Sequence, residues 1–404
     1  MLRAGVGVSR DKRGRAAAFE AASRAMARAG SEPARLCLCF ATPDHRAGMG
    51  SLLGAVGQIT RAPHVVGCSA AGVLTGEGEL EGDSSVGVLV ASGPTLEARP
   101  LLVPAPVEPG LALSAAIERA LGAPEQPEPP SSAGRVAGPG ERVVLLTFAG
   151  NLGPRPSELL AALGAAVPKN WIIGGGAVGG VDGGDVWLDG RVAPGGLAGL
   201  QISGAPRVVV GLAHGCRPVG QPLTITRARG NLILELDGRP AFEPFARLCR
   251  EPLLADLRRA ASFVFAGLPT GGAGRGEYLV RSFVGFDPGA GVLAVSEAVE
   301  EGQTLTFLLR EAQRARRDLE EMLAEVRAGL GGAQPAFGIY VNCAGRGAGL
   351  YGVPDHDTAY IRRALGEFPL LGFFSSAEIV PLGGRPRLEM FTGVLCVFAE
   401  IALA

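Results

Sequence analysis

One pattern occurs three times in this chain and constrains its fold more than any other feature. Each copy runs through an apolar strand, a polar loop, a helix, a second apolar run ending in Gly, a turn of small residues and a closing strand. The interval from the first strand to that Gly is similar in all copies: Phe40 to Gly67, Phe148 to Gly174, and Cys343 to Gly372. Repetition at a spacing of tens of residues indicates duplicated architecture.

The copies consist of matching segments whose turns differ. The first comprises residues 35–40, 51–59, 65–72 and 85–92, the second 143–148, 157–167, 171–180 and 196–203, and the third 337–343, 357–365, 370–378 and 392–400. Their turns read CSAAG, GGAVG and FFSSAE. Chemistry that distinguishes one copy from another is therefore expected at the turns.

Alternating strands and helices predict an α/β protein, and hairpins within each copy favour mixed sheets over purely parallel ones. We expect the repeated strand-helix-strand-hairpin units to form two layered α/β domains, residues 1–210 and 211–404. The second domain opens with a different segment. Alternation predicts an antiparallel pair turning at residues 229–231, a helix from Pro240, two further strands, and a long helix after Thr306 that Gly331 stops.

Composition excludes several classes of protein. With 404 residues, 47% of them hydrophobic, the chain can bury large cores, and its net charge of −1 leaves no electrostatic footprint for nucleic acid. No uncharged apolar run is long enough to span a membrane, and no signal peptide is visible. Seven cysteines lie scattered along the chain, and Cys37 and Cys39 fall on one strand face, typical of a core. We expect a reduced, cytoplasmic protein without membrane insertion.

Six motifs of the C-terminal half, in order, resemble those of the FIST sensory proteins. They are HGCRPVG, ITRARGNLILELDGRPA, YLVRSFVGFD, NCAGRG, LLGFFSSAEI and FTGVLCVF. In the N-terminal half the resemblance rests on VVGCSAAG and WIIGGGAVGG, so both FIST segments are covered. Two positions depart from the family pattern: Val73, where Glu often follows CSAAG, and Ala377, where Gly commonly precedes Glu378.

The resemblance implies a small-ligand sensory module for amino acids or related metabolites, with no established catalytic activity and no cofactor. The chain carries no recognisable kinase, cyclase or DNA-binding segment. A signal would therefore pass to a separate protein. A plain interaction scaffold, in which the same turns dock a protein partner, is the alternative.

Two turns of the third copy offer groups for such a ligand. In NCAGRG, backbone amides near Gly347 can cup an anion, and Arg346 can grip a carboxylate; Cys343 lies beside that cation. After Gly372, the turn SSAE adds Ser375 and Glu378. A cation and an anion at one sheet end could hold both ends of an amino acid. Equally, Arg346 could pair with an acid of the protein, Glu378 included.

A Cys- or Ser-dependent hydrolase that uses Cys68, Ser69 or Cys343 is a less favoured alternative. GCSAAG resembles a nucleophile elbow around Cys68 and Ser69, but Ala71 replaces its last Gly. Nothing in the sequence links His214 or His356 to Ser69. Cys68 and Ser69 are instead retained as candidate ligand contacts.

Three further features have ordinary explanations. GGGAVG (174–179) matches a dinucleotide fingerprint, but a hairpin rather than a helix is predicted after it. Asp355 and Asp357 of PDHD are more simply helix caps than metal ligands, so no metal site is predicted. Arg281 lies within an apolar strand, which usually places a charge on the solvent face; it is a further candidate for binding an anionic ligand.

Overall fold

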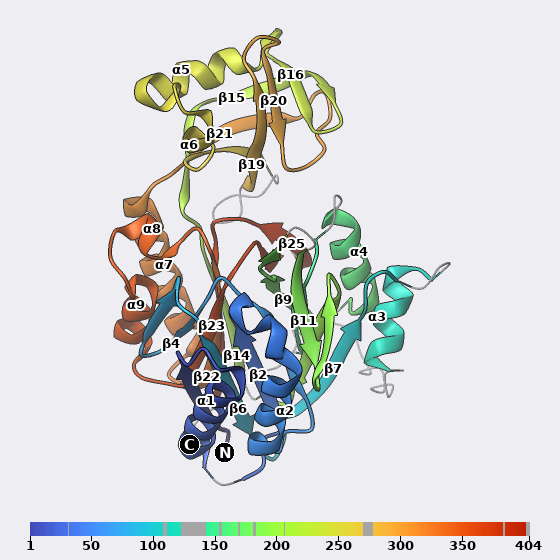
Figure 1. The fold of residues 1–404 in the computed structure, drawn as a ribbon. Coiled ribbons are helices and arrows are strands. Elements are labelled where there is room, and N and C mark those ends of the chain that lie inside the picture. The colour runs from blue at the N-terminus through green and yellow to red at the C-terminus, as the bar shows by residue number, and fades with distance from the viewer. Residues whose placement is uncertain are drawn as a thin grey trace, which may run out of the picture. The chain divides into compact units, whose positions relative to one another are not determined.

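The computed structural model describes residues 1–30, 32–107, 111–122, 143–152, 156–168, 170–180, 183–205, 207–269, 278–382 and 384–400. It confirms a mixed α/β fold with parallel and antiparallel strand pairs (Figure 1). The chain divides into two compact units. Unit 1 comprises Met1–Leu212, Glu320–Leu388 and Thr392–Ala404, and unit 2 comprises Ala213–Leu319 and Glu389–Phe391.

The three copies lie in unit 1 apart from Ala213, residues 312–319 and Glu389 of the third copy, which are grouped with unit 2. Each copy is longer than the sequence pattern indicated, because a strand and a helix precede it. The first copy contains β1 (Arg3–Ser9), α1 (Gly14–Ala29), β2 (Leu36–Ala41), α2 (Met49–Thr60), β3 (Val65–Ser69), β4 (Gly72–Thr75), β5 (Gly78–Glu81) and β6 (Val86–Ser92). The second contains β7 (Glu97–Val103), α3 (Leu113–Leu121), β8 (Val144–Ala149), α4 (Pro156–Ala166), β9 (Trp171–Gly176), β10 (Gly179–Gly180), β11 (Gly183–Leu188), β12 (Arg191–Pro194) and β13 (Leu197–Ser203). The third contains β14 (Arg207–Ala213), α7 (Ala312–Leu330), β22 (Gln334–Cys343), α8 (Gly347–Tyr351), α9 (His356–Leu365), β23 (Leu370–Ser375), β24 (Glu378–Leu382), β25 (Arg385–Glu389) and β26 (Gly393–Glu400).

Each copy builds the same core of a sheet. Its two central strands run parallel: β2 with β3, β8 with β9, and β22 with β23. The closing strand, β6, β13 or β26, pairs antiparallel with the first of them. The opening strand, β1, β7 or β14, lies beside the closing strand. The triplication predicted from the sequence is therefore a triplication of sheet topology.

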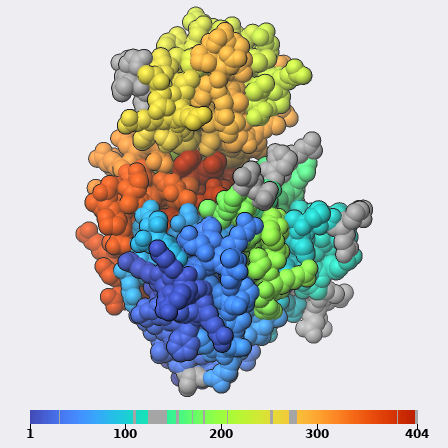
Figure 2. All heavy atoms as spheres, in the orientation of Figure 1, coloured from blue at the N-terminus to red at the C-terminus, as the bar shows by residue number. Residues whose placement is uncertain are grey.

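The copies exchange their hairpins in a closed cycle. The hairpin β4–β5 of the first copy pairs with β23 of the third, β11–β12 of the second with β3 of the first, and β24–β25 of the third with β9 of the second. In Figure 2 the light-blue atoms of the first hairpin lie against the orange atoms of the third copy. No copy completes its sheet alone, so the three are parts of one folding unit.

The Gly that recurs in every copy has a steric cause. A Cβ on Gly67 would stand 1.7 Å from the carbonyl oxygen of Cys39, on Gly174 1.7 Å from that of Thr147, and on Gly372 2.1 Å from that of Tyr340. In each case the blocked atom belongs to the residue paired with the Gly across the parallel strands. The close approach of these strands leaves no room for a side chain.

The shared core of unit 1 lies between the three sheets. At its centre the rings of Phe40, Phe148 and Phe373 meet pairwise with centroids 4.5–5.6 Å apart. Phe40 and Phe148 come from first strands, whereas Phe373 comes from the second strand of its copy. In the third copy, the first-strand position that holds Phe40 or Phe148 elsewhere holds the smaller Val341, and its partner on the second strand is the large Phe373. The large side chain therefore comes from the other strand, and the core is filled to a similar extent.

Unit 2 consists mainly of the residues between β14 and α7 in the sequence. Its elements are β15 (Cys216–Arg229), β16 (Leu232–Leu236), β17 (Arg239–Pro240), α5 (Phe242–Leu253), α6 (Leu257–Ala260), β18 (Val264–Pro269), β19 (Tyr278–Asp287), β20 (Val292–Val295) and β21 (Thr304–Arg310). The strands close into a ring because β15 pairs with both β21 and β16. A cluster of Phe side chains fills its interior, including Phe245, Phe283 and Phe307.

The start of the long helix was predicted too early. Residues 304–310 form β21, because this strand pairs on both sides, with β15 and with β18, and α7 begins only at Ala312. The predicted stop is confirmed, since α7 ends at Leu330 directly before Gly331. The hairpin predicted after GGGAVG is also confirmed, as β11 and β12.

Candidate functional site: the strand ends of the third copy

The three copies can be compared position by position because the same Gly pairs with the same place on the first strand. Two residues beyond that place stand Ala41, Ala149 and Asn342. Ala41 and Ala149 are small and apolar, whereas Asn342 carries an amide. All three are buried. The third copy thus holds a polar group where its two relatives hold a methyl.

The same contrast occurs twice more. Three residues after the Gly stand Ala70, Ala177 and Ser375. On each exchanged hairpin, one residue pairs with the second-strand residue that directly follows the recurring Gly. That residue is Val73 in the first copy, Val186 in the second and Glu378 in the third.

A carboxyl group therefore occupies a position that holds a core valine in the other two places. Burying polar and charged groups costs free energy that alanine and valine avoid. We use "polar strand end" for Asn342, Arg346, Ser375 and Glu378, all fully buried.

Glu378 is held by three neighbours. It accepts hydrogen bonds from the Ser375 hydroxyl (2.6 Å) and the Thr392 amide (3.1 Å), and the Cys343 thiol contacts it as well. Burial raises the pKa of Glu378 to about 8, although these bonds and the Arg346 charge favour the carboxylate. At neutral pH the group is therefore mainly protonated and can both donate and accept a hydrogen bond.

Room for Glu378 comes from the strand it faces. Its paired residue is Gly175, where the first copy has Cys68 and the third has Phe373. A Cβ on Gly175 would stand 2.8 Å from the Ala377 carbonyl oxygen and 2.9 Å from both Ser375 and Val341. The second copy thus leaves space for the polar group of the third.

Arg346 pairs with an acid of the protein, but that acid is Asp357 and not Glu378. Its Nε lies 3.2 Å from Asp357 Oδ2, and its Nη2 donates to the Tyr351 hydroxyl (2.8 Å). Asp357 also accepts from the Tyr340 hydroxyl (2.7 Å) and contacts the His356 ring nitrogen (3.1 Å).

Burial disfavours both charges of this pair. The Arg346 guanidinium and the hydrogen bonds nevertheless hold the pKa of Asp357 well below its usual range. Asp357 in turn holds the pKa of Arg346 above its usual range against the effect of burial. The pair stays ionised.

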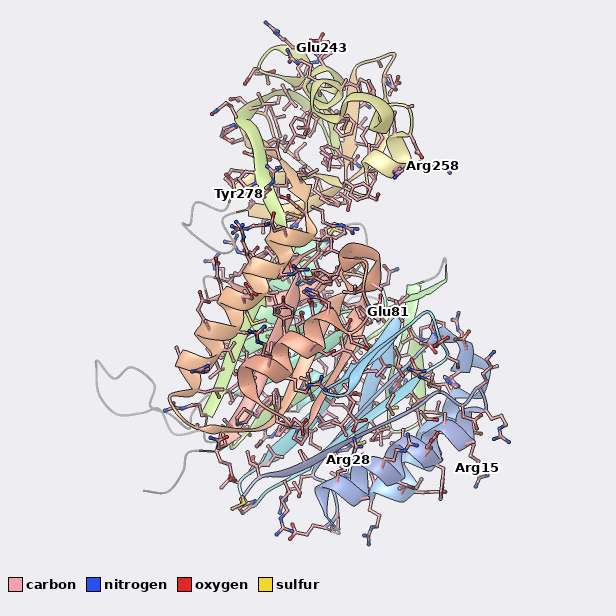
Figure 3. All side chains as sticks on the ribbon, turned by 90° about the vertical axis from the view of Figure 1, so that its left-hand side faces the viewer. Arg15, Arg28, Glu81, Glu243, Arg258 and Tyr278 are labelled. Atoms are coloured by element: carbon pink, nitrogen blue, oxygen red, sulfur yellow. The ribbon has the colours of Figure 1, made fainter. Side chains whose placement is uncertain are left out.

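Two glutamates of the exchanged hairpin reach the same region. Glu79 accepts from the Thr358 amide (2.9 Å) at the start of α9. Glu81, labelled in Figure 3, accepts from the Ala348 amide (2.8 Å) in α8. A Cβ on Gly347 would lie 1.9 Å from Glu81 Oε2, so any larger residue would displace the Glu81 carboxylate. Carboxylates at helix N-termini are stabilised by the helix dipole. The first copy therefore contacts both α8 and α9, the helix that carries Asp357.

The turns that distinguish the copies bind one another through their backbones. Ala71 N donates to Phe374 O (3.0 Å), Val178 N to Ser69 O (2.9 Å), and Ser376 N to Gly176 O (3.0 Å). These bonds link the first copy to the third, the second to the first, and the third to the second. The three turns form a closed ring, which explains why their residues are small.

Cys68 and Ser69 lie in this ring, on a different copy from the polar strand end. Burial raises the pKa of Cys68 well above its ordinary value, which disfavours a thiolate nucleophile. The Ser69 hydroxyl exchanges hydrogen bonds with the backbone of Asp185, accepting from its amide (2.9 Å) and donating to its carbonyl (3.2 Å). This geometry gives no support to a hydrolase.

Arg281 belongs to unit 2 and is not on the solvent face, so that expectation was wrong. Only 5% of it is exposed, and its guanidinium pairs with Glu297 and donates to the Val280 carbonyl (2.9 Å). Gly372 and Cys343, by contrast, lie on the strands that carry the polar strand end. Among the described residues, no group of three His, Cys, Asp or Glu side chains could hold a metal ion.

Sequence reasoning missed several members of this region. Asp357 was interpreted as a helix cap, while Tyr340, Tyr351, Glu79 and Asn342 were not singled out. Asn342 could have been found by setting the three copies beside one another at the recurring Gly. The glutamates of β5 could not, because nothing local indicates that this hairpin pairs with β23.

Comparison with known proteins agrees with the fold. The FIST N domain matches residues 35–239, and the FIST C domain matches residues 241–381. The chain belongs to the FIST family. It is 34% identical to an uncharacterized protein of Mycobacterium tuberculosis over 412 residues, covering 99% of this chain and all of the relative. An uncharacterized protein of Mycobacterium bovis is 31% identical over 411 residues, covering 99% of each chain.

FIST domains are associated with sensing in signal transduction rather than with catalysis. The boundary between the two matches falls at residues 239–241, inside unit 2, so neither match coincides with a compact unit. Division of the chain at residues 210 and 211 stays a prediction. None of the described helices is both long and apolar enough to cross a membrane.

Proposed function

We propose that this FIST protein senses an amino acid or related carboxylate at the polar strand end of its third copy and passes the signal to a separate protein. One observation carries the proposal: Asn342, Ser375 and Glu378 replace Ala or Val of the equivalent places. Buried polar groups that a fold does not need are typical of functional sites, where local rules are broken for another purpose.

Asn342 adds a specific argument. Neither its amide nitrogen nor its amide oxygen has a hydrogen-bond partner among the described residues, although the residue is fully buried. Buried polar atoms are nearly always paired, so an unpaired amide invites a ligand or water. Strand alternation places it on the same sheet face as Tyr340, whose hydroxyl binds Asp357.

Each polar group has a role in binding. A neutral Glu378 with Ser375 would recognise a carboxylate by donating to it, and the Asn342 amide would accept from an ammonium group or donate to a carboxylate. The ionised Arg346–Asp357 pair would contribute to the electrostatic potential at the bound ligand while its own hydrogen bonds stay intact. Buried thiols at Cys37, Cys39, Cys68 and Cys396, which form no disulfide, fit a reducing cytoplasmic setting.

The test compares ligand response in variants that restore the residues of the other copies. Thermal unfolding of the full chain is measured against a panel of amino acids and carboxylates, since a ligand at 100 times its dissociation constant stabilises by about 2.7 kcal/mol. Asn342→Ala and Ser375→Ala should fold normally and lose the response. Cys68→Ala, in the turn of the first copy, should keep it.

Two results would count against this proposal. If no compound of the panel shifts the unfolding temperature, docking of a protein partner becomes the better explanation, and that partner would be sought by pull-down. If Asn342→Ala and Ser375→Ala respond as strongly as the parent protein, the ligand binds elsewhere.

A further inference from the structure

The hairpin that the first copy contributes to the third carries three glutamates in different surroundings. Glu77 lies in the turn between β4 and β5, and Glu79 and Glu81 lie on one face of β5, because side chains alternate along a strand. Of the three, Glu79 is buried, Glu81 is half-buried and Glu77 is exposed. The same ionisable group can therefore be compared in three places within one hairpin.

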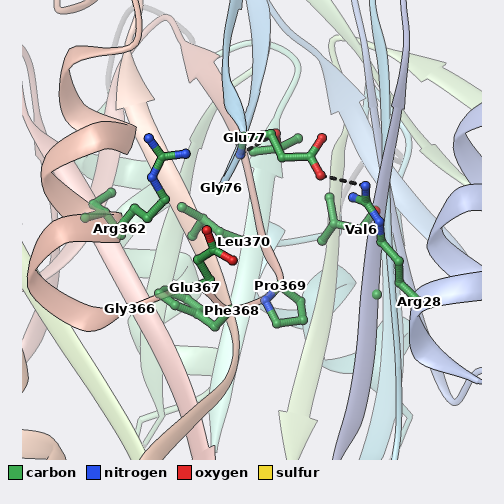
Figure 4. A pocket seen from close by; sticks show the side chains of 13 residues that line it. Val6, Arg28, Gly76, Glu77, Arg362, Gly366, Glu367, Phe368, Pro369 and Leu370 are labelled. Atoms are coloured by element: carbon green, nitrogen blue, oxygen red, sulfur yellow. Dashed lines mark hydrogen bonds and ion pairs between the residues drawn. The ribbon is translucent and has the colours of Figure 1, made fainter.

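Glu77 is the ordinary case of the three. Its carboxylate pairs with the Arg28 guanidinium at 2.6 Å beside a cavity of about 360 Å³, and both side chains reach solvent (Figure 4). An exposed ion pair of this kind contributes little to stability. Glu77 therefore provides the reference for a carboxylate of this hairpin whose charge has little effect on packing.

Glu79 lies against the third copy with its carboxyl group shielded from water. Its Oε1 accepts a hydrogen bond from the Thr358 amide (2.9 Å), whereas its Oε2 is buried and has no partner among the described residues. Only 8% of the residue is exposed. A carboxylate is stable when both oxygens are hydrogen-bonded or hydrated. Ionisation of Glu79 in this place therefore costs free energy that the neutral acid avoids.

The charges nearest to Glu79 add to that cost. Asp357, which stays ionised, and Glu81 both present negative charge to it, whereas the contact with Thr358 favours the carboxylate. Burial, together with these two negative charges, outweighs that contact and raises the pKa of Glu79 to about 7. Glu79 is thus the one member of this trio that changes its charge near neutral pH.

Other titratable groups surround the hairpin on both sides. On the side of the third copy, Arg346 is paired with Asp357, and on the side of α1, Arg24 is paired with Glu20. Among the described residues, no cation forms an ion pair with Glu79, so nothing compensates its charge. The remaining titratable groups around it are Tyr340, Tyr351, Asp355 and His356 of the third copy, and Arg10 and the Arg13-bound Asp11 of the first.

We propose that Glu79 makes the docking of the exchanged hairpin sensitive to protons: the neutral acid lets β5 pack against α8 and α9, and the carboxylate weakens that packing by repelling Asp357 and Glu81. The docked state holds this proton more tightly than the released state, in which a glutamate titrates at about 4.3. The contribution to docking is therefore complete below about pH 4.3 and is lost as pH rises through about 7. Near neutral pH, small changes of pH alter how firmly the first copy holds the third.

Hydrogen exchange of the full chain, followed by mass spectrometry, tests this proposal. Peptides covering β4–β5 (residues 72–81) and the start of α9 (residues 356–361) are compared at pH 6 and pH 8, after correction for intrinsic exchange rates. For a group that titrates at about 7 when docked and about 4.3 when released, linkage predicts an opening equilibrium about tenfold higher at pH 8. Glu79→Gln keeps an oxygen for the Thr358 amide but has no proton to lose, so its rise should be smaller than the parent's by that factor.

Two matched variants complete the test. Glu77→Gln removes the exposed partner of Arg28 and should follow the parent. Glu81→Gln keeps an acceptor for the Ala348 amide but removes one of the two negative charges, so its rise should lie between those of the parent and Glu79→Gln.

An equal rise in the parent and Glu79→Gln would overturn the proposal, and so would a rise in Glu77→Gln as small as that in Glu79→Gln. If Glu79→Gln fails to fold by circular dichroism, Glu81→Gln decides, because a rise equal to the parent's would then contradict repulsion within the hairpin. No ligand enters this experiment, so its outcome is independent of the amino acid panel.

Discussion

At three matched places, the first and second copies carry Ala or Val, whereas the third carries the buried polar residues Asn342, Ser375 and Glu378. Topology, parallel pairing and the recurring Gly are the same in all three. The fold therefore does not require Asn342, Ser375 or Glu378, because it is built twice without them. An internal repeat thus separates what a scaffold needs from what one copy adds to it.

The largest effect is expected where the third copy carries charge. Arg346→Met should lower the free energy of unfolding by about 3–5 kcal/mol, because Asp357 stays buried without its counter-ion. Arg3→Met, which removes an exposed pair with Glu32, should change it by less than about 1 kcal/mol. Chemical denaturation of both variants measures the difference. Similar small losses would mean that Asp357 is satisfied by Tyr340 and His356 alone.

Gly175→Ala tests the space that the second copy leaves for the third. Its Cβ would meet Ser375 and Val341 at 2.9 Å, so we expect a loss of about 1–3 kcal/mol by overpacking. Gly190→Ala, at a turn with no neighbour within 4 Å but a positive φ of 82°, provides a comparison in which only backbone strain acts. If Gly175→Ala were the milder change, the strand ends would be looser than the structure shows.

Glu378→Val restores the residue of the equivalent places and should change how stability depends on pH. The pKa of Glu378 is raised in the folded protein, so the folded state holds its proton more tightly than the unfolded state. That contribution is complete below about pH 4.3, the ordinary Glu pKa, and is lost as pH rises towards 8. Urea unfolding at pH 5, 6, 7 and 8 should therefore show the variant gaining on the parent with rising pH.

Asn342→Ala should have the smallest effect on stability. The amide has no partner among the described residues, so its removal relieves desolvation that offsets the lost packing. We expect an unfolding free energy unchanged or raised by about 1 kcal/mol. A loss above about 2 kcal/mol would instead show that the amide holds an ordered water that the fold requires.

The sequence could predict much of this architecture because the repeated elements are local. Segments 65–72, 171–180 and 370–378 carry their own hydrophobic pattern and turn residues, and the structure confirms their strands. The opening strand and helix of each copy were not recognised as parts of the repeat because they precede the shared pattern, and most of unit 2 separates β14 from α7 in the third copy. Phe307 was assigned to a helix because pairing on both sides of β21 is a tertiary effect that periodicity does not carry.

The candidate site was less predictable for a related reason. The turns after Cys343 and Gly372 identified Arg346 and Glu378, but their partners depend on folding over distance. Asp357 approaches Arg346 through α9, and Glu79 arrives on a hairpin that pairs with a strand some three hundred residues further along the chain. Side chains brought together in this way leave no pattern within any one segment.

The cyclic exchange of hairpins has a consequence for the chain as it is synthesised. When the first copy leaves the ribosome, β4–β5 has no partner until β23 has been made, and β9 waits for β24. Until then these strands present open edges, which pair readily with other chains. A product truncated before residue 370 would keep those edges open permanently. Only protein that includes these last strands should escape aggregation, because only there are the edges of β4–β5 and β9 paired.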